Sequence, residues 1–387
     1  MLLSFAFFIP ISQPLSSGLL ILTLLYSFLS PGSIKGIKYF QEGWDLWLFI
    51  ALLATGMLYT LDLSNGLKVI ETSLSLVALP FIFARVVYFT KSDLYKILYA
   101  FCAGLLVACI ICLITAMLKY SDQGGGVFFG DELVSVLENT HTIYLIYYLN
   151  FAVTFILYLL YHDESKIHGA VMLASLMVYF LMIILTGSST AIVGILFSLL
   201  YFVLKFIYEV KRTKSQWVVF SISVFFLMFL LAQNSLNLFG QYGIQQEDYW
   251  ERFVLWESAI HAMPNWVIGV GTGDYTSVLN EYYRSHDLSS FALANYNPHN
   301  QFIETLFSVG IPGLAALLVL IGRPMYMAVK SQNIIGFLSI FPFLIYGMSE
   351  VFLGRYQGVV FFALLHQAFV SFYLQQESDL ALKEARF

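Results

Sequence analysis

Long apolar segments separated by short polar ones run along almost the whole chain. Most of them hold about 20 residues, enough for a helix to cross the roughly 30 Å hydrocarbon core of a bilayer. The short alternating segments of a membrane β-barrel do not occur in this pattern. The sequence therefore predicts an all-α polytopic membrane protein with about twelve transmembrane helices, at residues 2–11, 15–30, 44–60, 67–89, 95–118, 140–161, 167–186, 190–208, 215–233, 299–321, 335–349 and 356–374.

Two longer polar segments interrupt this pattern, at residues 119–139 and 234–298. A segment as long as the second is usually functional or disordered. This one is rich in Tyr, Trp and Asn and holds a helical pattern, "EDYWERFVLWESAIHAM". We expect four parts: helices 1–9 in residues 1–233, an extracytoplasmic loop with an amphipathic helix in 234–298, helices 10–12 in 299–374, and a cytoplasmic tail in 375–387.

Composition and charge support this membrane assignment and give it an orientation. The chain is 59% hydrophobic and 11% charged, whereas soluble domains carry about 25% charged residues. If residues 234–298 face outward, most of the 19 basic residues fall on the cytoplasmic side. The positive-inside rule then predicts cytoplasmic termini. The basic residues left outside are Lys68, Lys119, Arg252, Arg284 and Arg355.

The stretch "NPHNQFIE" places polar residues at the start of an apolar segment. Asn297 is a suitable helix N-cap and Pro298 suits the first helical position, which would put His299 and Asn300 in the first turn. Asn300 and Glu304, four apart, would share a helix face. A helix N-terminus favours a neutral imidazole, which can accept a proton from a hydroxyl. The alternative is that His299 lies at headgroup level and Glu304 pairs with a nearby base.

Arg252 and Trp256 lie one helical turn apart in the outer segment. An arginine fork can bind phosphate oxygens, and the indole can stack on a sugar. The alternative is an interfacial amphipathic helix with an aromatic anchor. Pro264 is expected to end this helix. The following "GVGTGDY" follows no predicted strand and opens no helix, so it is not a dinucleotide-binding motif.

Two further groups of polar residues lie at predicted outer ends of spans. Glu350 and Arg355 lie in "SEVFLGRYQG", where a substrate role and an Glu350–Arg355 ion pair are both open. Charged groups at membrane depth are costly and therefore candidates for function. His141, in "LENTHTIYLIYYLN", is either structural or part of an acceptor site. The sequence offers no candidate partner for His366, in the final span.

Four motifs stand in one order: "LTGSSTAIVGIL", "ERFVLWESAIHAMPNWVIGVGTGDY", "NPHNQFIETLFSVGIPG" and "SEVFLGRYQGVVFFA". Their order and spacing resemble the O-antigen ligase/polymerase superfamily of bacterial membrane glycosyltransferases, over about residues 130–375. The resemblance implies about twelve helices, a long periplasmic loop, and inverting glycosyl transfer on the outer face of the inner membrane. It implies a glycan donor on undecaprenyl pyrophosphate, and an acceptor hydroxyl on lipid A–core or on a growing polysaccharide. It implies no metal and no nucleotide cofactor, and we expect no nucleic-acid partner.

The resemblance also assigns residues. His299 matches the histidine proposed to activate the acceptor, and Arg252 matches the arginine of the loop helix, so both are predicted to be catalytic. The family commonly has an arginine where this chain has Ser189. Either Arg355, Arg284 or Lys68 supplies the missing charge, or the activity is altered, or the chain is a polymerase with another donor geometry. The residues predicted to bind substrate are Asn300, Glu304, Trp256, Arg355, Glu350, His141, Ser189 and Arg284.

Other functions remain open at this stage. Within the enzymes, they are polymerisation of a capsule or exopolysaccharide, or transfer of a glycan to protein. In a different class, the chain would be a transporter or flippase for lipid-linked sugars. Transporters usually carry polar or broken segments near the membrane midplane, whereas the polar candidates here cluster at the predicted outer ends of the spans.

Overall fold

The computed structural model describes residues 1–29, 40–86, 88–137, 140–164, 167–187, 189–236 and 249–384. Regular structure in these ranges is helical, and no strand occurs in them, as the apolar pattern predicts. The chain divides into two compact units, residues 1–17 with 96–246 and residues 18–95 with 247–387. Two helices, α2 (Gln13–Leu29) and α7 (Lys91–Gln123), contribute residues to both.

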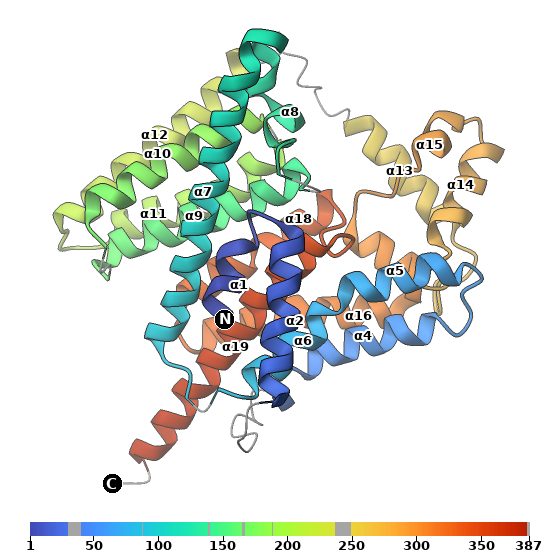
Figure 1. Ribbon diagram of the computed structural model, residues 1–387, viewed down its shortest axis with the longest axis horizontal. Coiled ribbons are helices and arrows are strands. Elements are labelled where there is room, and N and C mark those ends of the chain that lie inside the picture. The colour runs from blue at the N-terminus through green and yellow to red at the C-terminus, as the bar shows by residue number, and fades with distance from the viewer. Residues whose placement is uncertain are drawn as a thin grey trace. The chain divides into compact units, whose positions relative to one another are not determined.

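The first unit is built around one almost wholly buried helix, α9. Its apolar residues are distributed all round the helix, as expected for a segment enclosed by other helices. It contacts α10, α11 and α12 (Figure 1). The elements of this unit, besides parts of α2 and α7, are α1 (Leu2–Phe8), the 3₁₀ helix η1 (Gly125–Phe128), α8 (Gly130–Val134), α9 (Thr142–His162), α10 (Gly169–Thr186), α11 (Ser189–Tyr208) and α12 (Lys214–Leu236).

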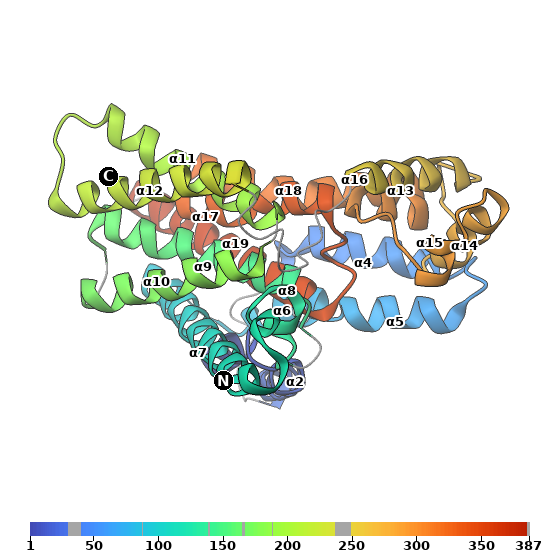
Figure 2. The ribbon, with the colours of Figure 1, turned by 90° about the horizontal axis from the view of Figure 1, so that it is seen from above.

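The second unit is organised around α16, which contacts α4, α13, α17, α18 and α19. Figure 2 shows α4 running alongside α16, with α5 next to α4. Its elements are α4 (Trp44–Gly56), α5 (Leu63–Ser73), α6 (Ser75–Phe83), α13 (Tyr249–Ala262), α14 (Tyr275–Ser285), α15 (Ser289–Ala294), α16 (Gln301–Lys330), α17 (Ile334–Ile340), α18 (Pro342–Ser349) and α19 (Tyr356–Glu384).

Each of the twelve predicted apolar segments is largely helical in the described residues. Among the described residues, six stretches are long and apolar enough to cross a membrane: Leu63–Phe83, Lys91–Asp122, Thr142–His162, Gly169–Thr186, Gln301–Lys330 and Tyr356–Glu384. Further apolar helices have described parts of 10–17 residues each. The fold is therefore that of an α-helical membrane protein, and the count of twelve spans stays a prediction.

The long helix α16 is kinked, where the sequence predicts one continuous span. Val309 and Gly310 leave helical geometry. Pro312 has no N–H group, so the carbonyl of Ser308 lacks its usual helical donor, and Gly271 supplies one at 2.9 Å. The N–H of Ile311 turns outward to the carbonyl of Trp266, also at 2.9 Å. At the "SVGIPG" sequence, backbone groups of α16 thus form hydrogen bonds with the loop after α13.

A buried charged cluster joins three helices of the second unit. His366 on α19 contacts Oδ2 of Asp45 on α4 through Nε2 at 2.8 Å. Arg323 on α16 donates to Oδ1 of the same carboxylate at 3.2 Å and also pairs with Glu42. The side chains of His366 and Asp45 are fully buried. His366 therefore has a partner that the sequence did not reveal, because the two residues lie far apart in the chain.

Candidate functional site

The start of α16 holds the predicted catalytic histidine, but the helix begins later than the sequence suggests. Asn300, not Asn297, is the N-cap: its side-chain oxygen accepts from the N–H groups of Phe302 and Ile303, both at 3.0 Å. Asn297 instead accepts from the N–H of His299 at 2.8 Å, which forms an Asx turn. His299 has a positive φ of 44° and lies outside the helix. The prediction of His299 in the first turn is therefore wrong.

His299 pairs with a carboxylate from another part of the chain. Its Nδ1 lies 3.0 Å from Oε2 of Glu350, the residue that follows α18. The other carboxylate oxygen of Glu350 accepts from the N–H of Val351 at 3.0 Å. The buried Gln301 holds the same segment in place, because its Oε1 accepts from the N–H of Leu353 at 2.7 Å. Glu350 therefore pairs with His299, not with Arg355 as one alternative had it.

The protonation of this pair follows from its surroundings. Burial alone would raise the pKa of Glu350, but the hydrogen bond and charge of His299, the N–H of Val351 and the charge of Arg252 together lower it. A carboxylate that remains ionised can only accept, so Nδ1 of His299 carries the proton. When His299 is neutral, its Nε2 holds a lone pair that can accept a proton. The side chain of His299 is 29% exposed.

Arg252 approaches the same pair from α13. It lies on the helix face that carries Leu255 and Ala259, at spacings of three and seven residues. Both are buried, so this face points inward. One guanidinium nitrogen, Nη1, donates to the carbonyl oxygen of Ser349 at 2.5 Å. The positive charge of Arg252 thus lies beside Glu350, which explains its contribution to the lowered pKa of that carboxyl group.

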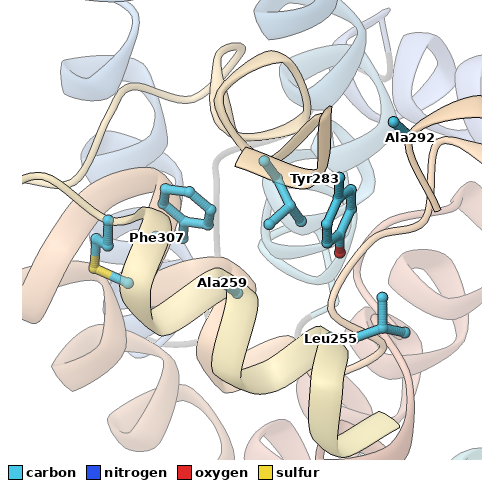
Figure 3. Close-up of a cluster of buried hydrophobic side chains, with 7 residues drawn as sticks. Leu255, Ala259, Tyr283, Ala292 and Phe307 are labelled. Atoms are coloured by element: carbon cyan, nitrogen blue, oxygen red, sulfur yellow. The ribbon is translucent and has the colours of Figure 1, made fainter. Parts of the chain in front are cut away.

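A small apolar core fixes α13 against the start of α16. Figure 3 shows this core, with Leu255 and Ala259 on α13 and Tyr283 and Phe307 beside them. It joins α13, α14, α15 and α16, and its buried members are Leu255, Ala259, Met263, Leu279, Tyr283, Ala292 and Phe307. This core packs α13, which carries Arg252, against α16, which begins just after His299. The predicted outer segment is therefore folded over residues 249–298.

The glycine-rich motif after α13 is a structural clasp. Both carboxylate oxygens of Asp274 accept backbone N–H groups, from Leu61 and Asp62, each at 2.7 Å. The hydroxyl of Thr272 donates to the carbonyl of Leu53 at 2.6 Å. A side chain at Gly271, where φ is 112°, would collide with Thr60. The motif binds α13–α15 to the turn between α4 and α5, a role that the sequence did not indicate.

Glu304 lies in the first turn of α16 and has no basic partner among the described residues. Its carboxylate interacts with the hydroxyl of Tyr275, and burial and the charge of Glu304 raise the pKa of that tyrosine. Oε2 of Glu304 is buried and has no hydrogen-bond partner among the described residues. Glu304 also lies within electrostatic reach of Glu350. The described residues give no support to the alternative in which Glu304 pairs with a base, and Tyr275 is a contact that sequence reasoning missed.

The other predicted site residues of the second unit differ in their burial and in their hydrogen bonds. Asn300 is occupied as the N-cap, and its side-chain nitrogen reaches the carbonyl of Met348 at 3.4 Å. Trp256 is half-buried, and its ring lies 5.9 Å from that of Phe253. Arg284, in the last turn of α14, and Arg355, before α19, are exposed. Their roles stay predictions.

Two predicted residues belong to the first unit. His141 is the N-cap of α9, where its Nδ1 accepts from the N–H of Ile143 at 3.4 Å. This supports the structural alternative for His141. Ser189 is the first residue of α11, and its side chain lies outside the described part of the structure. Neither residue adds to the geometry of His299, Glu350 and Arg252.

Residues 173–318 match the family model described as O-Antigen ligase. This match confirms the resemblance to the O-antigen ligase superfamily. The matched range includes α13, Arg252, His299 and the kink of α16. The chain is also similar to a protein of Haemophilus influenzae described as uncharacterized, with 26% identity over 122 residues, which is 29% of this chain and 31% of that protein. The match thus spans about a third of that relative. Together with the apolar helices, the family match supports a membrane protein.

Proposed function

We propose that the protein is a membrane glycosyltransferase of the O-antigen ligase/polymerase type. It transfers a glycan from undecaprenyl pyrophosphate to a sugar hydroxyl, on lipid A–core or on a growing polysaccharide. The site would face the periplasm, at the outer surface of the inner membrane. The single observation that carries this proposal is the His299–Glu350 pair, 3.0 Å apart and beside Arg252.

The reaction assigns one task to each of these three residues. The oxygen of the acceptor hydroxyl attacks the anomeric carbon of the donor sugar, and its proton passes to Nε2 of His299 as the new C–O bond forms. The bond from the anomeric carbon to the pyrophosphate oxygen breaks with inversion. Ionised Glu350 orients His299 and stabilises the imidazolium, in the way a buried aspartate does in a catalytic triad. Fixed positive charge at Arg252 stabilises the departing pyrophosphate.

The chain supplies three of the groups that this reaction uses. The cation for the leaving group lies on α13, the base lies just before α16, and its orienting carboxylate lies in the segment after α18. The amide N–H groups at the start of α16 are taken by Asn300, so Arg252 is the stronger candidate for pyrophosphate. The substitution at Ser189 leaves open which further cation, if any, joins Arg252.

His299→Ala tests the assignment of the base. Purified protein in nanodiscs is given a lipid-linked glycan donor and a glycan acceptor, and transferred glycan is measured. We expect His299→Ala to lose transfer by a factor of about 100 or more, the range for general-base catalysis. His286→Ala is the matched control, because His286 lies exposed at the end of α14 and should retain full activity. Normal transfer by His299→Ala would reject the proposal.

Deleting the gene and separating surface polysaccharide on a gel distinguishes the acceptors. Loss of all long chains from lipid A–core, with lipid-linked polymer accumulating, indicates a ligase. A single repeat unit on the core indicates a polymerase. Unchanged lipopolysaccharide would favour capsule polymerisation, protein glycosylation or the transport of lipid-linked sugars. Transport would also leave purified protein without transferase activity.

A further inference from the structure

Two short apolar segments of the second unit lie together and are strongly exposed. Leu58 and Leu61 lie in the turn after α4 and are 85% and 92% exposed, and Val267, in the loop after α13, is 60% exposed. The hydroxyl of Tyr59 donates to the carbonyl of Ile268 at 2.5 Å and so joins the turn to the loop. We name this surface the apolar lip; its members are Leu58, Tyr59, Leu61, Trp266, Val267 and Ile268.

The lip is continuous with the exposed face of a candidate membrane span. The N–H of Ile311 donates to the carbonyl of Trp266 at 2.9 Å, so the loop adjoins α16 just after its kink. Ile311 begins a stripe of exposed apolar side chains on α16 that continues through Leu318, Tyr326 and Val329. In a helix that crosses a membrane, exposed apolar side chains face lipid.

The lip is held in shape by its backbone and carries no charged side chain. The side-chain oxygen of Asn265 accepts from the N–H of Val267 at 2.8 Å, and the clasp of Asp274 fixes the turn at Leu61. The nearest acid in the turn, Asp62, caps α5. A rigid patch that presents Trp, Tyr, Val, Ile and Leu at the end of a span has the composition of a membrane–water interface.

We propose that the apolar lip is embedded in the edge of the bilayer, on the side of the candidate site, in contact with phospholipid acyl chains. The part of α16 after Gly310 is about 30 Å long at 1.5 Å per residue, which matches the hydrocarbon core. The shorter part before the kink carries the candidate site. The lip therefore holds that site at the membrane surface. This proposal depends on α16 crossing the membrane and does not depend on the reaction.

Site-directed spin labelling of protein in nanodiscs of phosphatidylethanolamine and phosphatidylglycerol tests the proposal. The three native cysteines are buried, so the unmodified protein gives the labelling background. Val267→Cys and Leu61→Cys report on the lip, with Ile268→Cys as a second position in the loop. Leu318→Cys on α16 is the lipid-facing reference. Ser290→Cys, on exposed α15, is the water-facing reference.

Collision of each label with oxygen, which partitions into lipid, is compared with collision with a water-soluble nickel complex. We expect the lip positions to match Leu318→Cys, with oxygen collision exceeding nickel collision several-fold. Lip positions that match Ser290→Cys would overturn the proposal. Weak collision with both reagents would mean that protein covers the lip, from this chain or a second copy, and would also overturn it.

Discussion

At the scale of single residues, His299 depends on a partner 51 residues further along the chain. Its place in a polar motif identified it from the sequence. The identity of its partner, and with it the tautomer of the imidazole, came only from tertiary structure. The sequence pattern predicts the N-cap at Asn297, whereas the cap is Asn300, and the local chemistry of the two asparagines is the same. The hydrogen bond between Gln301 and Leu353 is a long-range contact at the start of the helix. The sequence pattern alone could not show which asparagine caps it.

Glu350→Gln tests the charge of the carboxylate. The pKa of Glu350 in the folded protein lies below its ordinary 4.5. Ionised Glu350 therefore stabilises the fold above that pH, and this contribution is lost as pH falls through the lowered value. Glu350→Gln lacks the titration, so its thermal midpoint should fall less than that of the parent between about pH 6 and about pH 3. Glu281→Gln, on exposed α14, should follow the parent. Parallel curves for Glu350→Gln and the parent would contradict the paired carboxylate.

Arg252→Lys tests the geometry of the guanidinium. The arginine donates from Nη1 to the carbonyl of Ser349, and its planar guanidinium holds several donors in one fixed geometry. A lysine ammonium keeps the charge but cannot reproduce that geometry. We expect the transfer rate to fall by about 100-fold, the size of losing one preorganised donor, with expression unchanged.

Arg212→Lys is the matched comparison for that variant, because the guanidinium of Arg212 also donates to backbone carbonyls, those of Phe206 and Ile207, and the residue is not part of the candidate site. It should lose much less activity. A fully active Arg252→Lys would mean that charge alone suffices. An equal loss at both positions would mean that the fork of Arg252 has no special role.

At the scale of elements, the apolar pattern located the helices well but missed the break in α16. Residues 299–321 form one apolar run in the sequence, yet Gly310 has φ 68° and ψ −165°, a region open essentially to glycine. A glycine in such a run also suits ordinary helix packing, so its backbone angles are not readable from pattern. The loop after α13 forms hydrogen bonds with the backbone groups that the kink leaves without helical partners. These contacts join residues far apart in the sequence, so a local pattern does not reveal them.

Gly310→Ala tests the kink. A Cβ atom there would collide with the carbonyl oxygen of Val267, and the backbone angles would cost about 1–3 kcal/mol more. We expect the thermal midpoint in detergent to fall by several degrees, and the loop after α13 to become sensitive to protease. Gly322→Ala on the same helix is the control, since a Cβ atom there meets nothing within 4 Å. An unchanged midpoint for Gly310→Ala would show that the kink is not required.

At the scale of the whole molecule, composition gave the fold class and hydropathy gave the membrane environment. The sequence could not show which polar residues of the apolar helices contact one another. Asp45, Arg323 and His366 come from three helices and form a buried cluster, although no local signal connects them. Buried charged groups are tolerated only when they are paired. A charged residue in an apolar segment therefore predicts that a partner exists, but it does not identify that partner.

The bias of basic residues gives the whole chain an orientation that can be tested directly. With the twelve predicted spans, most of the 19 basic residues would fall on the side opposite to residues 234–298. This predicts that α13–α15 and His299 face outward and that the end of α19 faces the cytoplasm. Single cysteines at Ser290 on α15 and Ala381 on α19, both exposed, report on the two sides. Neither substitution changes the charge that sets the orientation.

A membrane-impermeant maleimide should label Ser290→Cys in intact spheroplasts, and Ala381→Cys only after lysis. The buried native thiols keep the background low, because burial also raises the barrier to reagent access. The reverse pattern would place the His299–Glu350 pair on the cytoplasmic side. A glycan carried by a lipid on the outer leaflet could not then reach the base, so the proposed function would fail even if the geometry of the pair were correct. Agreement would connect the charge bias of the sequence to the side on which the chemistry occurs.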